Sequence, residues 1–218
     1  QNQILLEQAL KTAAKQLPTA SVGTTDSTTE SITFDVSVAD VDGVIETGTI
    51  FAELYYNNTS TGIRKPLVIG ENSAISFAGI NSNTPYKIKI IADYDLDNGD
   101  NIVSAYPMLE FSYNTKAKAK PAAVIENIVP STDTITFNVI LSDVDSVLTS
   151  QARAELYIGE TYTGQSITLD EGINSNVQFT GVYSDQPYII LIVADYDLND
   201  NINVLIGDQI AYSFAETQ

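Results

Sequence analysis

Alternation of apolar and polar residues is the main pattern along this chain. In SITFDVSVAD, residues 31–40, every second residue from Ile32 to Val38 is apolar and the residues between are polar. The segment YKIKIIADYD, residues 86–95, alternates in the same way. A period of two residues is typical of a β-strand with one buried face. The pattern therefore predicts strands, separated by turns rich in Asp, Asn and Gly.

This pattern is written twice. ADYDLDNGD at 92–100 returns as ADYDLNDN at 194–201, and SITFDVSVAD returns as TITFNVILSD at 134–143. Two copies of one module therefore cover most of the chain. We place the modules at residues 19–114 and 122–218, joined by a linker at 115–121.

A helical period occurs at the N-terminus. In QILLEQALKTAAKQL, residues 3–17, Leu6, Leu10, Ala13 and Leu17 follow a spacing that places them on one side of a helix. Pro18 ends the run. We predict an N-terminal helix within residues 1–18, which either packs on the first module or ends a coiled coil that continues upstream. Because the chain starts at Gln1, we expect a processed product or a part of a longer protein.

Each module contains about seven short strands with turn residues between them and no internal helix, as in a β-sandwich. The predicted fold class is therefore all-β: two tandem β-sandwiches preceded by a short α-helix.

The segments FAGINSNTPYKIKIIA at 77–92 and FTGVYSDQPYIILIVA at 179–194 resemble the fibronectin type III family. In that family an apolar-Gly step leads into a strand that begins with tyrosine, whose hydroxyl bonds back to the corner backbone. Tyr86 and Tyr188 stand at this position. The chain has no tryptophan, and Phe34 and Phe137 are the nearest candidates for the position that the family's core tryptophan occupies. The resemblance implies Ig-like sandwiches of the fibronectin type III kind.

A narrower resemblance rests on three features: the DVDG turn at 40–43, the AELY strand at 52–55 and 154–157, and the YDL-type acidic loop. Tandem modules with these features are similar to those in tail, fibre and baseplate proteins of phages of Gram-positive bacteria, and to those of some bacterial surface proteins.

The composition of the chain excludes several kinds of partner and of catalysis. Lys and Arg number 10 against 28 Asp and Glu, a formal net charge of −18. Such a surface repels phosphate and anionic lipid, so we expect neither nucleic acid nor membrane as a partner. Cys and His are absent, which excludes disulfides, thiolate chemistry, the usual zinc ligands and catalysis by Ser-His or Cys-His pairs. We predict that the chain is not an enzyme.

The acidic loops carry the candidate site. With the strand order of the fibronectin type III family, the DVD turn and the DYDL loop share one pole of each module. Carboxylates gathered there need screening, and Ca²⁺ prefers oxygen ligands of this kind. Alternatively, the acidic residues form polar turns that cap their own backbone. The possible calcium ligands are Asp40, Asp42, Asp95 and Asp97 in the first module and Asp143, Asp145, Asp197 and Asp200 in the second.

The predicted function is a non-enzymatic structural or adhesive part of an extracellular assembly, whose modules act as spacers. A phage virion appendage, such as a fibre, tail or baseplate subunit, is the first choice. The alternative is a bacterial cell-surface module that binds glycan or protein. Expected partners are further copies of the chain and other structural proteins of the assembly. We also expect Lys116, Lys118 and Lys120 to meet Asp143, Asp145 or Asp197 and stiffen the joint between modules.

Overall fold

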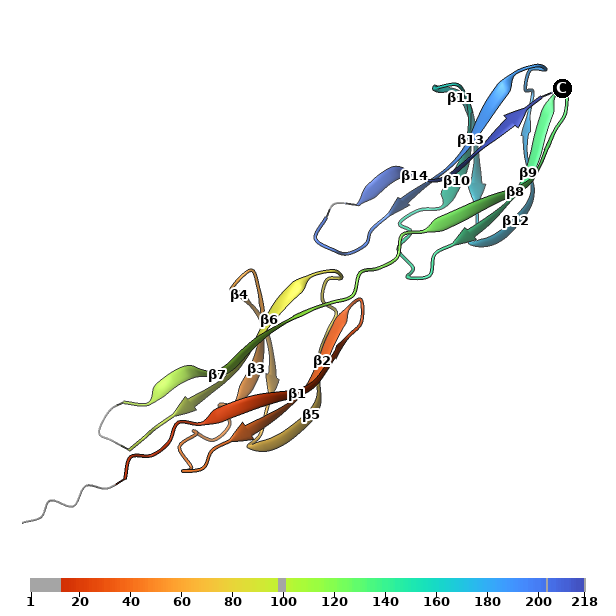
Figure 1. The fold of residues 1–218 in the computed structure, drawn as a ribbon. Helices are drawn as coiled ribbons and strands as arrows, with labels where there is room; N and C mark the ends of the chain where they lie inside the picture. The colour runs from red at the N-terminus through yellow and green to blue at the C-terminus, as the bar shows by residue number, and fades with distance from the viewer. Residues whose placement is uncertain (1–12, 98–100, 203, 218) are drawn as a thin grey trace, which may run out of the picture. The chain divides into compact units, whose positions relative to one another are not determined.

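The computed structural model describes residues 13–97, 101–202 and 204–217 (Figure 1). Over these residues the chain forms fourteen β-strands and no helix. It divides into two compact units, of which the first contains Gln1–Ile80 and Pro85–Thr115 and the second contains Asn81–Thr84 and Lys116–Gln218. The division between Thr115 and Lys116 falls inside the stretch expected to be a linker.

Each unit contributes seven of the strands. Those of the first unit are β1 (Thr19–Ser27), β2 (Ser31–Ala39), β3 (Phe51–Tyr56), β4 (Thr59–Pro66), β5 (Gly70–Ala78), β6 (Pro85–Tyr94) and β7 (Val103–Asn114). Those of the second unit are β8 (Ala122–Pro130), β9 (Thr134–Ser142), β10 (Ala152–Ile158), β11 (Thr161–Leu169), β12 (Gly172–Thr180), β13 (Pro187–Tyr196) and β14 (Leu205–Glu216).

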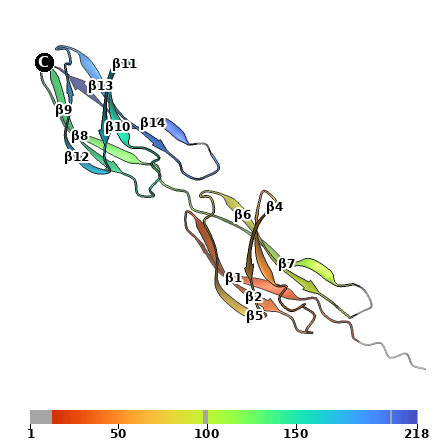
Figure 2. The same cartoon turned by 180° about the vertical axis from the view of Figure 1, so that it is seen from behind.

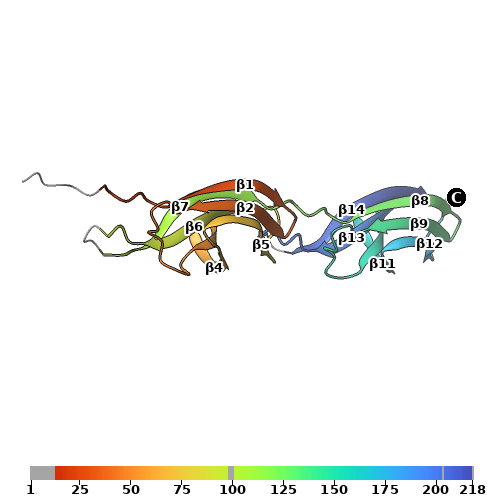
Figure 3. The ribbon, with the colours of Figure 1, turned by 90° about the horizontal axis from the view of Figure 1, so that it is seen from below.

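Both units are β-sandwiches made of two antiparallel sheets. The first unit has a three-stranded sheet in the order β1-β2-β5 and a four-stranded sheet in the order β4-β3-β6-β7 (Figures 1 and 2). The second unit repeats this order with β8-β9-β12 and β11-β10-β13-β14. Figure 3 shows β1 and β2 on one side of the first unit and β4 and β6 on the other. The all-β prediction is confirmed.

The apolar rows predicted from the alternation form the cores between the sheets. In β2, Ile32, Phe34, Val36 and Val38 are at most 2 % exposed, and the residues between them are only partly buried. Phe34 stacks on Phe77 with ring centroids 6.0 Å apart, and Phe137 stacks on Phe179 at 5.5 Å. Burial of one apolar row per strand supplies the main favourable term in the folding of each unit.

Tyr188 of the second unit is bonded to the backbone of the turn that precedes its strand. Tyr188 is 2 % exposed, and its hydroxyl oxygen accepts the backbone N–H of Tyr183 at 2.8 Å. This bond fixes the turn that leads into β13. Tyr86 occupies the equivalent position in the first unit and is 6 % exposed.

The predicted N-terminal helix is wrong over the part that can be checked. Residues 3–12 of that prediction lie outside the described residues, but Ala13 to Pro18 have no helical structure, and Leu17 is 45 % exposed instead of packing on a core. The residue before a proline is disfavoured in the helical conformation. In addition, the backbone N–H of Gln16 bonds to the carboxylate of Asp42. Local periodicity is overridden here by a tertiary hydrogen bond.

Among the described residues, no helix has the length and apolarity needed to cross a bilayer.

Candidate functional site

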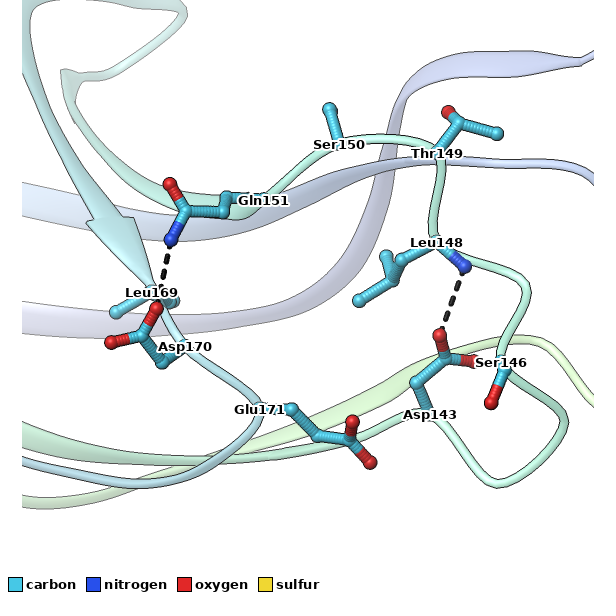
Figure 4. Close-up of a pocket in the computed structure, with 9 residues that line it drawn as sticks. All are labelled: Asp143, Ser146, Leu148, Thr149, Ser150, Gln151, Leu169, Asp170 and Glu171. Atoms are coloured by element: carbon cyan, nitrogen blue, oxygen red, sulfur yellow. Dashed lines mark hydrogen bonds between the residues drawn. The ribbon is translucent and has the colours of Figure 1, made fainter.

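The first aspartate of each DVD turn holds the turn together through its own carboxylate. Oδ1 of Asp40 and of Asp143 accepts the backbone N–H of the residue four positions later, at 2.8 and 2.9 Å. Oδ2 accepts the N–H of the residue five positions later, at 3.0 and 2.9 Å. Figure 4 shows the bond from Leu148 to Asp143. Asp143 is only 7 % exposed, so these charge-assisted bonds compensate the burial of its carboxylate.

The acidic loop after the long strand lies against this turn in both units. The N–H of Asp95 donates to the carbonyl of Val44 at 2.9 Å, and the N–H of Asp197 donates to that of Val147 at 2.9 Å. The two acidic tips therefore share one pole of each unit, as the sequence predicts.

The carboxylates of this loop also bond to nearby backbone. Oδ1 of Asp95 accepts the N–H of Asp97 at 2.8 Å, and Oδ1 of Asp197 accepts that of Asn199 at 2.7 Å. Oδ1 of Asp200 accepts the N–H of Ile202 at 3.1 Å. Such bonds are the usual way in which Asp stabilises a turn.

The chain enters each unit across this acidic pole. We call residues 13–18 and 116–121 the entry segments of the first and second units. Oδ2 of Asp42 accepts the backbone N–H of Gln16 at 2.6 Å, and Oδ2 of Asp145 accepts that of Ala119 at 2.6 Å. Each entry segment ends in a buried proline, Pro18 or Pro121. The same hydrogen bond therefore anchors the chain ahead of the first strand of both units.

Lysines of the entry segments add charge pairing at the pole. Lys15 forms an ion pair with Asp97, and this hydrogen bond raises the pKa of the Lys15 ammonium, with smaller contributions from the charges of Asp95 and Asp42. Asp97 is thus paired with Lys15, and the charges of Asp95 and Asp42 also favour the protonated lysine.

Lys120 of the second entry segment has partners other than those predicted. Its Nζ lies 3.6 Å from a carboxylate oxygen of Asp208 and 5.7 Å from the ring centroid of Tyr196. The Tyr196 hydroxyl, and then the charge of Asp208, raise the pKa of Lys120. Of the predicted aspartates, Asp145 does contact the segment, where it accepts the backbone N–H of Ala119.

These bonds limit what the pole can offer a metal ion. Within the described ranges, no group of three or more His, Cys, Asp or Glu side chains is placed to hold a metal. Asp40 and Asp143 use both oxygens on backbone N–H groups, and Asp42 and Asp145 use one on an entry segment. The arrangement fits the alternative of self-capping turns, and the calcium site stays a prediction.

A pocket of about 320 Å³ lies beside the DVD turn of the second unit (Figure 4). It is lined by Asp143, Ser146, Leu148, Thr149, Ser150, Gln151, Leu169, Asp170 and Glu171. The pocket has three carboxylates, those of Asp143, Asp170 and Glu171. Asp170 accepts a hydrogen bond from Gln151 at 2.8 Å and Asp143 accepts two from backbone N–H groups, so two of the three are already hydrogen-bonded within the unit.

The hydroxyl nearest to a base at this pocket is poorly activated. Ser150 Oγ donates to Asp195 Oδ2 at 3.0 Å. However, the N–H of Gly207, followed by Ser150 itself, lowers the pKa of Asp195. A carboxylate with a lowered pKa is a weaker base than usual, so this pair is poorly suited to generating a nucleophile.

The entry segments are the feature that sequence reasoning missed. A signal was present, since Lys15-Gln-Leu-Pro18 and Lys118-Ala-Lys-Pro121 share a Lys-x-x-Pro spacing at the same distance before each module. The helical period of residues 3–17 concealed the first copy.

No family model matches the chain, and no curated protein matches it significantly.

Proposed function

We propose that this chain is a non-enzymatic structural component of an extracellular assembly, in which two fibronectin type III-like modules act as spacers. The order of strands in the sheets of both units supports the fibronectin type III-like assignment, as does the bond between Tyr188 and the corner backbone. A phage virion appendage remains the first choice for the assembly, on the resemblance of the DVDG, AELY and acidic-loop segments.

The observation that carries the spacer role is the repeated anchoring of the entry segments. A spacer must limit the freedom of the chain where it enters each module. Asp42 and Asp145 do this with the same backbone hydrogen bond, and the proline that follows restricts the backbone further. The second entry segment includes the stretch between the two sandwiches, so its anchoring shortens the chain that is free to bend there.

Substitution of Asp145 tests this role against a matched control. Asp145→Ala removes the acceptor of the Ala119 N–H, so we expect greater flexibility between the units, seen in small-angle scattering as a raised Kratky plot and a broader distance distribution. Asp42→Ala removes the equivalent bond ahead of the first unit and should leave that profile as in the parent chain. Identical profiles for Asp145→Ala and the parent would reject the anchoring role.

The location of the chain in a source culture tests whether the assembly is a virion or a cell surface. An antibody against the chain, used for immunogold labelling of a source culture, should label released particles if the chain belongs to a virion. Label confined to the cell wall would support the bacterial surface module instead. The exposed aromatic residues Tyr212 and Phe214, 59 % and 66 % exposed, are the observation that keeps this second candidate open.

A further inference from the structure

A second pocket, of about 300 Å³, lies at the pole of the second unit opposite to its acidic loops. β10 leaves the acidic pole and ends at this other pole, where β11 and β13 begin. The pocket is formed by the hairpin between β10 and β11 and by the turn between β12 and β13. All of its lining residues are uncharged, among them Ile158, Thr161, Gln165, Val182, Tyr183 and Tyr188.

Tyr183 presents an exposed ring on a backbone that is held from both sides. Its N–H donates to the Tyr188 hydroxyl oxygen at 2.8 Å, and its carbonyl accepts the Thr217 hydroxyl at 2.6 Å. The residue is nevertheless 73 % exposed. The turn therefore fixes the attachment of an aromatic ring whose face is open for stacking.

The pocket also contains hydrogen-bonding groups that the unit itself does not use. The Tyr188 hydroxyl accepts one hydrogen bond, but no acceptor for its own hydrogen lies among the described residues. Because Tyr188 is only 2 % exposed, this donor is costly to bury unless a water or a ligand accepts from it. Within the described ranges, the Thr161 hydroxyl and the Gln165 side-chain amide make no hydrogen bond either. Together these three groups offer both donors and acceptors.

The first module shows that the sandwich does not require these groups. At the position of Tyr183 the first copy of the sequence has Asn81, and at the position of Gln165 it has Ile63. The strands on either side pair in the same register in both units. The aromatic ring and the amide are therefore additions to the second module and not part of its folding pattern.

We propose that this pocket binds a neutral pyranose residue of a glycan, with the Tyr183 ring against the C–H face of the sugar. The sugar hydroxyls would bond to the hydroxyls of Tyr188 and Thr161 and to the amide of Gln165. A pyranose combines an apolar face with hydroxyls that both donate and accept, which matches the two kinds of group in the pocket.

Other classes of ligand fit the pocket less well. An apolar ligand would leave the Tyr188 donor and the Gln165 amide without partners. A charged ligand would find no counter-charge in the lining, and the net charge of −18 repels anionic sugars in particular. An uncharged ligand rich in hydroxyls meets neither obstacle.

The size of the pocket sets the expected affinity. Its volume is at the lower end of the range for small-molecule sites, so it accommodates one sugar ring. A hexose has about twelve non-hydrogen atoms, which at the binding efficiency of ordinary ligands gives a dissociation constant of about 1–10 mM.

NMR titration of the whole chain tests this proposal. The probes are the methyl glycosides of glucose, galactose, mannose, N-acetylglucosamine, N-acetylgalactosamine and rhamnose, each added to about 50 mM to exceed the expected constant. At least one should shift the backbone amide signals of Tyr183 and Gln165 in a saturable way. The anionic N-acetylneuraminic acid should not. If none of the neutral sugars shifts these signals, or only the anionic one does, the proposal is overturned.

The first module provides the residues for the decisive variant. Tyr183→Asn with Gln165→Ile should raise the dissociation constant of the best sugar at least about tenfold, which corresponds to about 1.4 kcal/mol. Tyr212→Ser is the matched control, because it removes an exposed ring that does not line the pocket, and it should leave the constant unchanged.

Two further outcomes are decisive. If the double variant fails to fold by circular dichroism, Tyr183→Asn alone changes one exposed side chain and should still weaken binding. Unchanged affinity in a folded pocket variant would overturn the proposal, as would binding that is lost only in Tyr212→Ser.

The pocket is independent of the spacer function, since Asp145 and the entry segment lie at the other pole. Asp145→Ala should therefore bind the sugar as the parent chain does.

Discussion

The two four-stranded sheets of this protein carry equivalent apolar residues on their inner sides, but residues of different polarity on their outer sides. On the inner side, Ile88 and Ile90 of β6 correspond to Ile190 and Ile192 of β13, and all four are fully buried. On the outer side, the pairs Lys89–Glu110 and Leu191–Tyr212 occupy equivalent positions. The inner row of apolar residues specifies the sandwich, whereas the residues of the outer row can differ between the units without changing the fold.

The outer side of the first unit is stabilised by charge pairing. Lys89 Nζ lies 2.8 Å from Glu110 Oε1 and 4.7 Å from the ring centroid of Tyr55, and Arg64 lies 3.2 Å from Glu53. Lys89, Glu110 and Arg64 are partly exposed to solvent, and the buried Glu53 is paired with Arg64. The second unit instead has apolar side chains at the equivalent positions, of which Tyr212 and Phe214 are exposed.

The largest loss of stability is expected from substitutions in the two cores, which the units build from equivalent residues. Phe137→Ala should destabilise the second unit by about 3–5 kcal/mol, because it leaves a cavity beside Phe179. Phe34→Ala should do the same to the first unit, where Phe34 contacts Phe77 and Phe111. Urea denaturation of the full chain measures both, with the exposed Phe214→Ala as the control. A cost below about 1 kcal/mol for either core variant would mean that the two cores are not equivalent.

The smallest effect is expected from the ion pair of the first unit. A hydrogen bond from Lys89 lowers the pKa of Glu110, so the folded-state pKa lies below the unfolded one. The pair therefore stabilises the fold above the unfolded pKa, and this contribution is lost as pH falls through the lower, folded-state pKa of Glu110.

The size of this contribution should be below about 0.5 kcal/mol, since the two side chains are 26 % and 40 % exposed. Comparing Glu110→Gln with the parent chain by urea denaturation at several pH values isolates it. The two chains should differ above pH 5 by about that amount and converge in acid. A difference that grows as pH falls would have the wrong sign for this pair.

Much of the fold could be predicted because its signals are local or repeated. The alternation from Ile32 to Val38 identifies β2 and its buried row, and the second copy identifies β9 in the same way. The DVD turns were also recognisable, since Asp40 and Asp143 bond to N–H groups only four and five residues away. Over residues 13–18, the described part of the predicted helix, the Gln16 N–H bonds instead to Asp42, a residue that local periodicity does not identify.

The sequence by itself determined that there are two modules and that they are all-β, because strand period and duplication can be read without coordinates. The shared pole of their acidic tips was expected only from the strand order of the fibronectin type III family, which the segments at 77–92 and 179–194 resemble. Only the tertiary structure decided how the carboxylates are used and which outer side is apolar. An aspartate takes backbone N–H, lysine or metal according to which donors the fold brings within reach. The difference between the outer sides became visible only when strand register aligned Ile189 with Phe214 and Leu191 with Tyr212, at positions where the first unit aligns Lys87 with Ser112 and Lys89 with Glu110.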